Sequence, residues 1–447
     1  MNFIDLFSGC GGLSLGLLNA GLNGLFAIEK NQDAFATLKK NLIDENDYGN
    51  RKFNWDTNKL PIAPHDINEL IENKNLLAFL ENLGAEQSVD LIVGGPPCQG
   101  FSLAGRRNPK DPRNKLAESY LKVVEIIKPK FILMENVKGI NLKFDKHSDD
   151  ISMADKIKST LRDMGYSAIS FLENSTSWGV PQSRTRFLLI GIRNDLLPES
   201  INTLEIEKRL LITLVEKINN FSLSFIKKYN ISVPVTTEDA ISDLKTLYPS
   251  TKKKKLEISK DAPGERFNQL KYIESSNKKS NYQKLMRKNI KTTNFIAGGL
   301  RLANHSDIVK QRFEKILSDI SSKDISLKYN LSSGVNLPKK YIIEQLDTRK
   351  HTLFVLNKKK VSATITTLPD DLIHYDEPRI LTVRECARIQ SFPDWYEFTG
   401  PYTTGGERRK LNCPKYTQVG NAVPPLMAEG IGLFISQHLP EIIKKYK

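Results

Sequence analysis

Short apolar runs alternate with helix-like stretches over residues 1–193 of the chain. The apolar runs fall at residues 3–7, 24–28, 89–93, 131–134, 168–172 and 187–192. Each run has the length of a strand, whereas the longer segments between them are typical of helices. Strands that alternate with helices predict a doubly wound, Rossmann-like α/β sheet, in which ligands bind at the carboxyl ends of the strands.

The alternation stops between residues 194 and 360, where lysine and serine become frequent. This composition predicts a second, smaller, irregular module with long loops. Ordered patterns return in the run at 361–367, in a predicted helix at 382–391 and in a terminal helix at 424–439. We therefore expect a first domain at 1–193, a separate module at 194–360, and a segment at 361–447 that completes the first domain. A chain of 447 residues is long enough for two domains.

The positive charge of the chain is concentrated in one segment. Residues 191–360 contain 33 Lys and Arg against 18 Asp and Glu, and this excess equals the net charge of +15 of the whole chain. One basic segment on an otherwise balanced chain favours contact with a polyanion such as nucleic acid. A solvated, lysine-rich surface is the alternative that charge alone leaves open.

The cysteines and the ends of the chain indicate a cytoplasmic protein. The four cysteines, at positions 10, 98, 386 and 413, are far apart and form no C-x-x-C pair, which favours reduced thiols. The histidines are scattered too, so we expect no metal site. We also expect no membrane span, because no apolar run approaches about 20 residues, and no targeting segment, because a strand begins at residue 2.

A glycine turn follows the first predicted strand and leads directly into a predicted helix. It contains Gly9, Gly11 and Gly12, and such a turn presents backbone amides to a ligand. Glu29 ends the next strand, 20 positions beyond Gly9, where its carboxylate can accept both hydroxyls of a ribose. Ser14 replaces the third glycine of G-x-G-x-x-G, which favours a nucleoside without a pyrophosphate, such as S-adenosyl-L-methionine. A dinucleotide and a purely structural turn remain alternatives.

A further carboxylate, Asp66, lies near the expected end of another strand, in the sequence His-Asp-Ile. It could accept a hydrogen bond from the amino group of an adenine. An Asp in this position is equally suited to cap the N-terminus of a helix. The residues themselves do not decide between these two roles.

The sequence Gly-Gly-Pro-Pro-Cys-Gln-Gly-Phe-Ser at 94–102 places Cys98 directly after a predicted strand. Most cysteines are inert packing residues, but the flanking glycines and prolines favour a thiol held at the edge of the crevice. Another strand delivers Glu135 to the same edge, where a partly desolvated carboxyl group could donate a proton.

The sequence Gln-Ser-Arg-Thr-Arg at 182–186 leads into the last of the six strands. Alternation along an extended chain points Gln182, Arg184 and Arg186 to one side, where guanidinium groups can hold a carbonyl oxygen or phosphates. An exposed, charged strand edge is the alternative for this motif taken alone.

Taken together, these motifs resemble the DNA (cytosine-5)-methyltransferase family of bacterial restriction-modification systems. The resemblance rests on the glycine turn with Phe7, the Pro-Cys loop, the Glu-Asn-Val strand, the Gln-x-Arg-x-Arg motif and the sequence Gln-Val-Gly-Asn-Ala-Val-Pro-Pro at 418–425. They occur in the order of the family. A segment at 381–393, which includes Thr382, Glu385, Arg388 and Gln390, is similar to the motif that supports the recognition domain in the family. The resemblance covers residues 1–193 and about 361–440.

The resemblance implies a function and its site residues. The enzyme would transfer a methyl group from S-adenosyl-L-methionine to C5 of a cytosine flipped out of duplex DNA. Cys98 would add to C6, Glu135 would protonate or hydrogen-bond N3, and Arg184 would steady the O2 carbonyl. The cofactor-binding residues would be Phe7, Gly9, Gly11, Gly12, Glu29, Asp66 and Asn421, with no metal.

The resemblance also implies partners. Double-stranded DNA would be the substrate, and residues 194–360 would be the target recognition domain. The chain would act as a monomer and modify DNA for a type II restriction-modification system, whose endonuclease would share the target site without stable binding. The basic loop that contains Arg106, Arg107, Lys110, Arg113 and Lys115 could close over the DNA as a lid or be a flexible basic surface.

Two other functions remain possible from the sequence alone. One is an RNA methyltransferase of the same fold, but the Cys-Phe-Thr element of the tRNA-modifying branch is not found. The other is a DNA-binding regulator without catalytic activity, which we would expect to have lost Cys98 or Glu135, whereas both residues are present.

Overall fold

The computed structural model describes residues 1–46, 48–97, 115–143, 151–198, 203–245, 271–272, 279–290, 295, 297–348, 350, 352–403 and 412–445. The chain forms two compact units. Unit 1 comprises Met1–Trp178, Thr185–Phe225 and Val423–Lys447, and unit 2 comprises Gly179–Arg184 and Ile226–Ala422.

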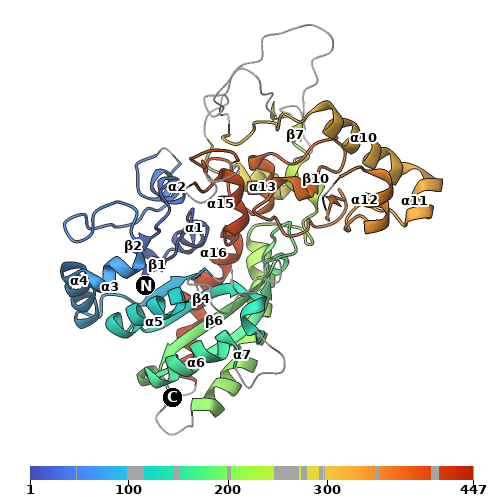
Figure 1. Ribbon diagram of the computed structural model, residues 1–447. Coiled ribbons are helices and arrows are strands. Elements are labelled where there is room, and N and C mark those ends of the chain that lie inside the picture. The colour runs from blue at the N-terminus through green and yellow to red at the C-terminus, as the bar shows by residue number, and fades with distance from the viewer. Residues whose placement is uncertain are drawn as a thin grey trace. The chain divides into compact units, whose positions relative to one another are not determined.

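Unit 1 is built on a six-stranded sheet (Figure 1). Its strands are β1 (Asn2–Leu6), β2 (Asn23–Ile28), β3 (Leu91–Gly94), β4 (Phe131–Val137), β5 (Tyr166–Asn174) and β6 (Thr185–Arg193), in the order β2-β1-β3-β4-β6-β5. Strands β2, β1, β3 and β4 are parallel, whereas β6 runs antiparallel to both β4 and β5. All six predicted strands and the mainly parallel α/β sheet are confirmed.

Helices connect and cover these strands. They are α1 (Gly12–Asn19), α2 (Gln32–Leu42), α3 (Ile67–Glu72), α4 (Lys74–Ala85), α5 (Leu116–Ile127), α6 (Met153–Asp163), most of α7 (Thr203–Lys228), α16 (Pro425–Leu433) and α17 (Leu439–Lys444). The main core joins Ile4, Ile92 and Ile132 of three neighbouring strands to Tyr120 and Val124 of α5. Burial of such apolar side chains supplies most of the free energy of folding.

Helix α16, near the C-terminus of the chain, packs closely on α1. A Cβ atom added at Gly16 would collide with Ala428 and with the carbonyl oxygen of Pro425. Glycine is therefore required at this position by the close approach of the two helices. This contact attaches the C-terminal end of the chain to the helix that follows the glycine turn.

Unit 2 is mostly helical in its described part (Figure 1). Its helices are α8 (Thr237–Ile241), α9 (Asn281–Met286), α10 (Asp307–Ser321), α11 (Lys323–Tyr329), α12 (Lys339–Gln345), α13 (Val383–Ile389) and α15 (Lys415–Asn421), with short strand pairs β7 (Leu244–Lys245) with β8 (Lys271–Tyr272) and β9 (Phe354–Val355) with β10 (Leu372–Ile373). One core cluster contains Phe313, Ile316, Tyr341 and Leu353. A smaller cluster contains Leu244 and Leu300.

The boundaries of the two units differ from those expected at residues 194, 360 and 361. Residues 194–225 belong to unit 1, because one face of α7 buries Leu210, Leu214 and Ile218. Residues 361–422 cluster with unit 2 instead of returning to the first domain, and only the chain from Val423 onward belongs to unit 1. Helix α7 and helices α10 to α12 also make residues 194–360 more regular than their composition suggested.

No helix in the described part of the chain combines the length and the apolar character that a membrane span requires.

Candidate active site

Three of the residues predicted for the site, Phe7, Glu29 and Glu135, lie in a single row of backbone positions across the sheet of unit 1. Ile28 of β2 pairs with Leu6 of β1, Leu6 pairs with Gly94 of β3, and Gly94 pairs with Met134 of β4. The next residue along each strand is therefore Glu29, Phe7, Gly95 and Glu135, in that order across the sheet. Neighbouring strands lie about 4.8 Å apart, so these four positions span roughly 14 Å of one sheet edge.

The glycine turn is held in a conformation that few residues adopt. Phe7, Gly9 and Gly11 all have positive φ, at 63°, 56° and 86°. Gly11 is the N-cap residue of α1, and its amide donates to the carbonyl oxygen of Ser8 at 2.9 Å. Glycine adopts this region at little cost, whereas Phe7 must be held there by its surroundings.

Glu29 is fastened to the turn by backbone amides. Its Oε2 accepts from the amide of Gly9 at 2.9 Å, and its Oε1 accepts from the amide of Asn31 at 2.6 Å. Burial raises the pKa of the Glu29 carboxyl above its ordinary value, although these amides act in the opposite direction. Each carboxylate oxygen still has a second acceptor site, so the pair can receive two ribose hydroxyls.

The geometry of the turn fits the nucleoside donor that the resemblance implies. A Cβ atom at Gly9 would meet no described atom within 4 Å, so there is open space beside the backbone of the turn. Helix α1 begins at the glycine turn, and its N-terminus favours a negatively charged group such as a carboxylate. Together with the fixed carboxylate of Glu29, these features suit S-adenosyl-L-methionine.

Asp66 caps helix α3. Its side chain accepts from the amide of Asn68 and forms a capping box with Glu69, and its Oδ2 lies 2.6 Å from Nζ of Lys30. Burial raises the pKa of the Asp66 carboxyl, but the hydrogen bonds from Lys30 and Asn68 outweigh this effect and leave it below the ordinary value. The interpretation of Asp66 as an N-cap is confirmed, and its contact with an adenine stays a prediction.

Glu135 forms an ion pair with Arg186 at the end of β4. Oε1 of Glu135 lies 2.8 Å from Nε of Arg186, and only 13% and 11% of the two side chains are exposed. Burial lowers the pKa of Arg186, and the charge of Glu135 opposes that effect. The antiparallel pairing of β4 with β6, which sets Arg186 opposite Val137, brings the two groups together.

The Glu135 side chain also lies beside the loop that leads to Cys98. A Cβ atom added at Gly95 would lie 3.0 Å from Oε2 of Glu135. The neighbouring Asn136 donates from Nδ2 to the carbonyl oxygen of Pro96 at 3.1 Å. These contacts join the end of β4 to the start of the Pro-Pro-Cys segment.

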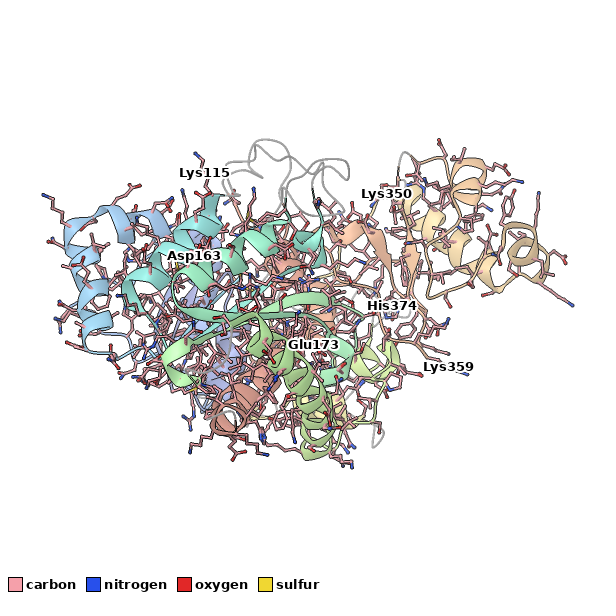
Figure 2. The ribbon with its side chains drawn as sticks, turned by 90° about the horizontal axis from the view of Figure 1, so that it is seen from below. Lys115, Asp163, Glu173, Lys350, Lys359 and His374 are labelled. Atoms are coloured by element: carbon pink, nitrogen blue, oxygen red, sulfur yellow. The ribbon has the colours of Figure 1, made fainter. Side chains whose placement is uncertain are left out.

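Cys98 itself lies outside the described residues, as do Arg106, Arg107, Lys110 and Arg113 of the proposed lid. Lys115 is described, and its side chain is exposed at the start of α5 (Figure 2). The lid therefore stays a prediction.

Arg184 and Gln182 belong to unit 2 and make buried hydrogen bonds there. The Arg184 guanidinium donates to the carbonyl oxygens of Ile365 at 3.2 Å and Gly420 at 2.9 Å. The Gln182 amide bonds to Gln390 at 2.9 Å, and Gln390 donates to the carbonyl oxygen of Val419. These bonds position the end of α15, and a contact of Arg184 with a substrate carbonyl stays a prediction.

Asn421 is the last residue of α15 and is exposed. The carbonyl groups of the two residues before it, Val419 and Gly420, accept the hydrogen bonds just described. Buried side chains of unit 2 thus fix the backbone that carries Asn421. Its proposed contact with the cofactor stays a prediction.

The arginine that partners Glu135 was not distinguished in the sequence. Alternation predicted that Gln182, Arg184 and Arg186 share one side, but β6 begins only at Thr185. The strand geometry therefore applies to Arg186 and not to Arg184. The register of β6 against β4, which depends on long-range pairing, was the missing information.

A family model described as C-5 cytosine-specific DNA methylase matches residues 1–437. The chain belongs to this family. The methylase fold and the resemblance inferred from the motifs are therefore confirmed.

Similar proteins cover almost the whole methylase. The type II methyltransferase M.DdeI of Desulfomicrobium norvegicum is 31% identical over 99% of this chain and 90% of its own length. The type II methyltransferase M.AgeI of Thalassovita gelatinovora is 30% identical over 98% of this chain and its full length. A crystal structure from E. coli, described as a DNA modification methyltransferase encoded within a prophage, superposes with a TM-score of 0.62 at 25% identity and covers 98% of this chain and 99% of that one.

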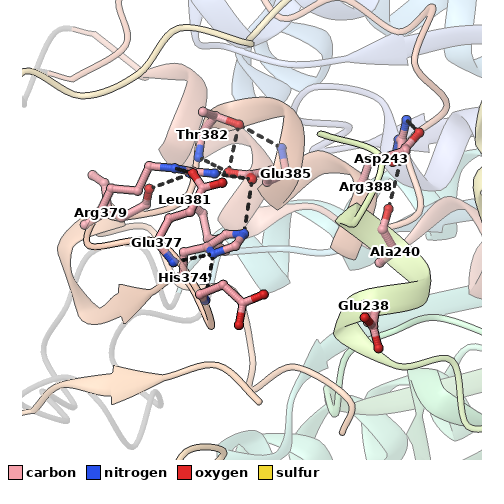
Figure 3. Close-up of polar contacts among 12 residues, drawn as sticks. Glu238, Ala240, Asp243, His374, Glu377, Arg379, Leu381, Thr382, Glu385 and Arg388 are labelled. Atoms are coloured by element: carbon pink, nitrogen blue, oxygen red, sulfur yellow. Dashed lines mark hydrogen bonds and ion pairs between the residues drawn. The ribbon is translucent and has the colours of Figure 1, made fainter. Parts of the chain in front are cut away.

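Unit 2 of the methylase contains a buried network of charged side chains around α13 (Figure 3). Arg388 pairs with Asp394 at 2.7 Å and with Asp243 at 2.6 Å, and it also donates to the carbonyl oxygen of Ala240. All three charged side chains are buried. One guanidinium thus joins segments that are 145 residues apart in the sequence.

A second part of this network caps the start of α13 (Figure 3). Thr382 and Glu385 form a capping box, and Arg379 donates two hydrogen bonds of 2.8 Å to the Glu385 carboxylate. Nδ1 of His374 accepts from the amides of Asp376 and Glu377 at 3.1 Å. The sequence identified Thr382, Glu385 and Arg388 through the family motif, but their partners came only from the structure.

Proposed function

We propose that this methylase transfers a methyl group from S-adenosyl-L-methionine to C5 of a flipped cytosine in duplex DNA, through a covalent adduct between Cys98 and C6. We further propose that it protects host DNA as the modification enzyme of a type II restriction-modification system. Its similarity to M.DdeI and M.AgeI, both named type II methyltransferases, supports the second part.

The observation that carries the proposal is the row of strand ends in unit 1. It sets the fixed carboxylate of Glu29 and the glycine turn beside Gly95 and Glu135, along one sheet edge. A nucleoside donor and a reacting base can be accommodated along the same roughly 14 Å of sheet edge. Proximity of this kind is a major source of rate enhancement.

The donor would be held mainly by main-chain groups. The carboxylate of Glu29 would accept hydrogen bonds from the ribose hydroxyls, and the turn that contains Gly9, Gly11 and Gly12 would lie against the nucleoside. Phe7 would contact the donor from the start of the turn, and Asp66 and Asn421 would contribute polar contacts. S-adenosyl-L-methionine supplies an electrophilic methyl group.

The base must be activated before it can take that methyl group. The Cys98 thiolate forms a bond to C6, and the electron pair of the C5–C6 double bond moves toward N3 and O2. Glu135, oriented by Arg186, donates a proton or hydrogen bond to N3 and relieves this charge. C5 then accepts the methyl group, loses its proton to a base or water, and elimination breaks the S–C6 bond. Arg184 would steady O2.

Target recognition is assigned to residues 194–360. The excess of 15 basic over acidic residues that lies between 191 and 360 suits the phosphate backbone of double-stranded DNA. The methylase would act as a monomer, because a single flipped base needs one active site. The endonuclease of the system would recognise the same target without binding the methylase stably.

The test is covalent capture on modified DNA. Duplexes in which 5-fluorocytosine replaces the target base should become linked to the protein in the presence of donor, because fluorine at C5 blocks the final elimination. The target is found first by bisulfite sequencing of DNA from cells that express the chain. The Cys98→Ala variant should bind the same duplex without becoming linked to it.

Other outcomes would overturn the proposal. Methyl transfer by Cys98→Ala, or failure of the wild-type protein to form the linked complex, would contradict the covalent route. Methyl incorporation into tRNA in preference to duplex DNA would indicate the RNA-modifying alternative. DNA binding without any methylation would indicate the regulator.

A further inference from the structure

Asp5 is a buried carboxyl group directly below the glycine turn, and the proposed mechanism does not use it. It is the fourth residue of β1 and has no exposed surface. Its Oδ2 accepts a short hydrogen bond from the hydroxyl of Ser14, in the first turn of α1. Its Oδ1 has no hydrogen-bond partner in the described part of the chain.

The surroundings of Asp5 disfavour a negative charge. Glu29 at the end of β2 acts on Asp5 with a like charge, and burial acts in the same direction. Helix α5 brings Tyr120, whose hydroxyl lies 3.3 Å from the carbonyl oxygen of Ile92. Strand β3 places Val93 opposite Asp5.

Burial, with the charge of Glu29 added, raises the pKa of the Asp5 carboxyl to about 7, although the Ser14 hydroxyl opposes the shift. An ionised carboxylate with one unbonded oxygen is costly to bury, because it loses its hydration without replacement. The neutral form of the Asp5 carboxyl group is therefore favoured unless a positively charged group binds nearby.

We propose that Asp5 is a proton-linked positioning residue for the methyl donor, protonated in the free protein and ionised when the donor binds at the glycine turn. This inference rests on the proposed function. S-adenosyl-L-methionine carries a sulfonium, an ammonium and a carboxylate, a net charge of +1, whereas the demethylated product has lost the sulfonium charge. The donor therefore stabilises the ionised form of Asp5 more than the product does.

The sign of the pH dependence follows from this linkage. A donor that lowers the pKa of Asp5 binds more tightly when the carboxyl is already ionised, so affinity is highest above pH 7 and falls as the pH drops below 7. Each unit by which the donor lowers this pKa changes affinity by about tenfold. We expect donor affinity to fall by about three- to tenfold between pH 8 and pH 6, and product affinity to fall less.

The experiment is calorimetric titration of the wild-type protein with S-adenosyl-L-methionine, and separately with the demethylated product. Titrations in two buffers of different protonation enthalpy give the number of protons released. Below pH 7 we expect release of up to one proton with the donor and less with the product. Infrared difference spectra should show a protonated carboxyl band in the free protein that donor binding removes.

Two variants test whether Asp5 is the residue that releases the proton when the donor binds. Asp5→Asn keeps the size of the side chain and a carbonyl acceptor for Ser14, but it cannot titrate. It should bind the donor with little pH dependence and no proton release. Ser14→Ala is the matched control, because it removes the hydrogen bond to Asp5 but retains the acid, so its proton release should persist.

These experiments test the role of Asp5 and the proposed function of the protein separately. Proton release that persists in Asp5→Asn would assign the linkage to Glu29 and overturn the inference, as would donor binding by wild type without proton release. If Asp5→Asn fails to fold, Ser14→Ala assigns the proton, because loss of the Ser14 hydrogen bond should raise the pKa of Asp5 and move the proton release to higher pH. Release at an unchanged pH would then overturn the inference. Failure of the donor to bind at any pH would instead refute the proposed function.

Discussion

The sheet edge of unit 1 and the α13 network of unit 2 use charged side chains in opposite ways. At the sheet edge, Glu29 is held by two backbone amides and Glu135 by one arginine, and each keeps acceptor capacity for another partner. In the network, Arg388 is fully buried and its donors bond to Asp243, Asp394 and a carbonyl group. Charged groups at a strand end that can still accept a hydrogen bond are able to take part in a reaction. Charged groups that are buried and fully paired instead hold segments of the chain together.

The largest expected effect concerns chemistry at the sheet edge. Glu135→Gln keeps a hydrogen-bond acceptor for Arg186 but removes the carboxyl group proposed to give a proton to N3, so methyl transfer should slow by about 10²- to 10⁴-fold. Donor affinity should change little, because Glu29 and the turn are untouched. Single-turnover transfer rates and donor titrations measure the two effects separately. Near-normal turnover would show that Glu135 is not the acid.

The next effect concerns stability in unit 2. Arg388→Met removes the guanidinium that bonds to the buried carboxylates of both Asp243 and Asp394, so the free energy of unfolding should fall by about 3–5 kcal/mol. Urea denaturation followed by circular dichroism measures the change.

The matched control for Arg388→Met is an exposed ion pair. Arg209 and Glu205 lie on α7 with more than half of each side chain exposed. Arg209→Ala should change the free energy of unfolding by less than about 1 kcal/mol. Equal losses from the two variants would contradict the contrast between buried and exposed charge.

The smallest effect concerns the cap of α13. Thr382→Ala removes the acceptor for the amide of Glu385, which lies 3.2 Å from the hydroxyl, and should cost about 1 kcal/mol. Thr382→Ser retains the hydroxyl and should restore most of that loss in the same denaturation assay. A loss as large as that of Arg388→Met would show that the cap, and not the ion pairs, dominates the network.

Local sequence predicted where the candidate residues of unit 1 lie along the sheet, because each of them follows a strand. The glycine turn, Glu29 and Glu135 could be placed from apolar runs and the rule that ligands bind at strand ends. Arg186 was not singled out, since its contact with Glu135 depends on the pairing of β6 with β4. The compact units also differ from the boundary expected at residue 361, because the bonds of Arg388 and Gln182 join segments distant in the chain.

The sequence by itself determined the strands, the glycine turn and the family, since these depend on local periodicity and on motifs whose residues are close together. Only the tertiary structure decided which arginine meets Glu135, which segments α13 joins, and that Asp5 is buried beside Glu29. The physical reason is that strand register and burial arise from contacts between residues far apart in the chain. A charge acquires its partner and its pKa only when those contacts have formed.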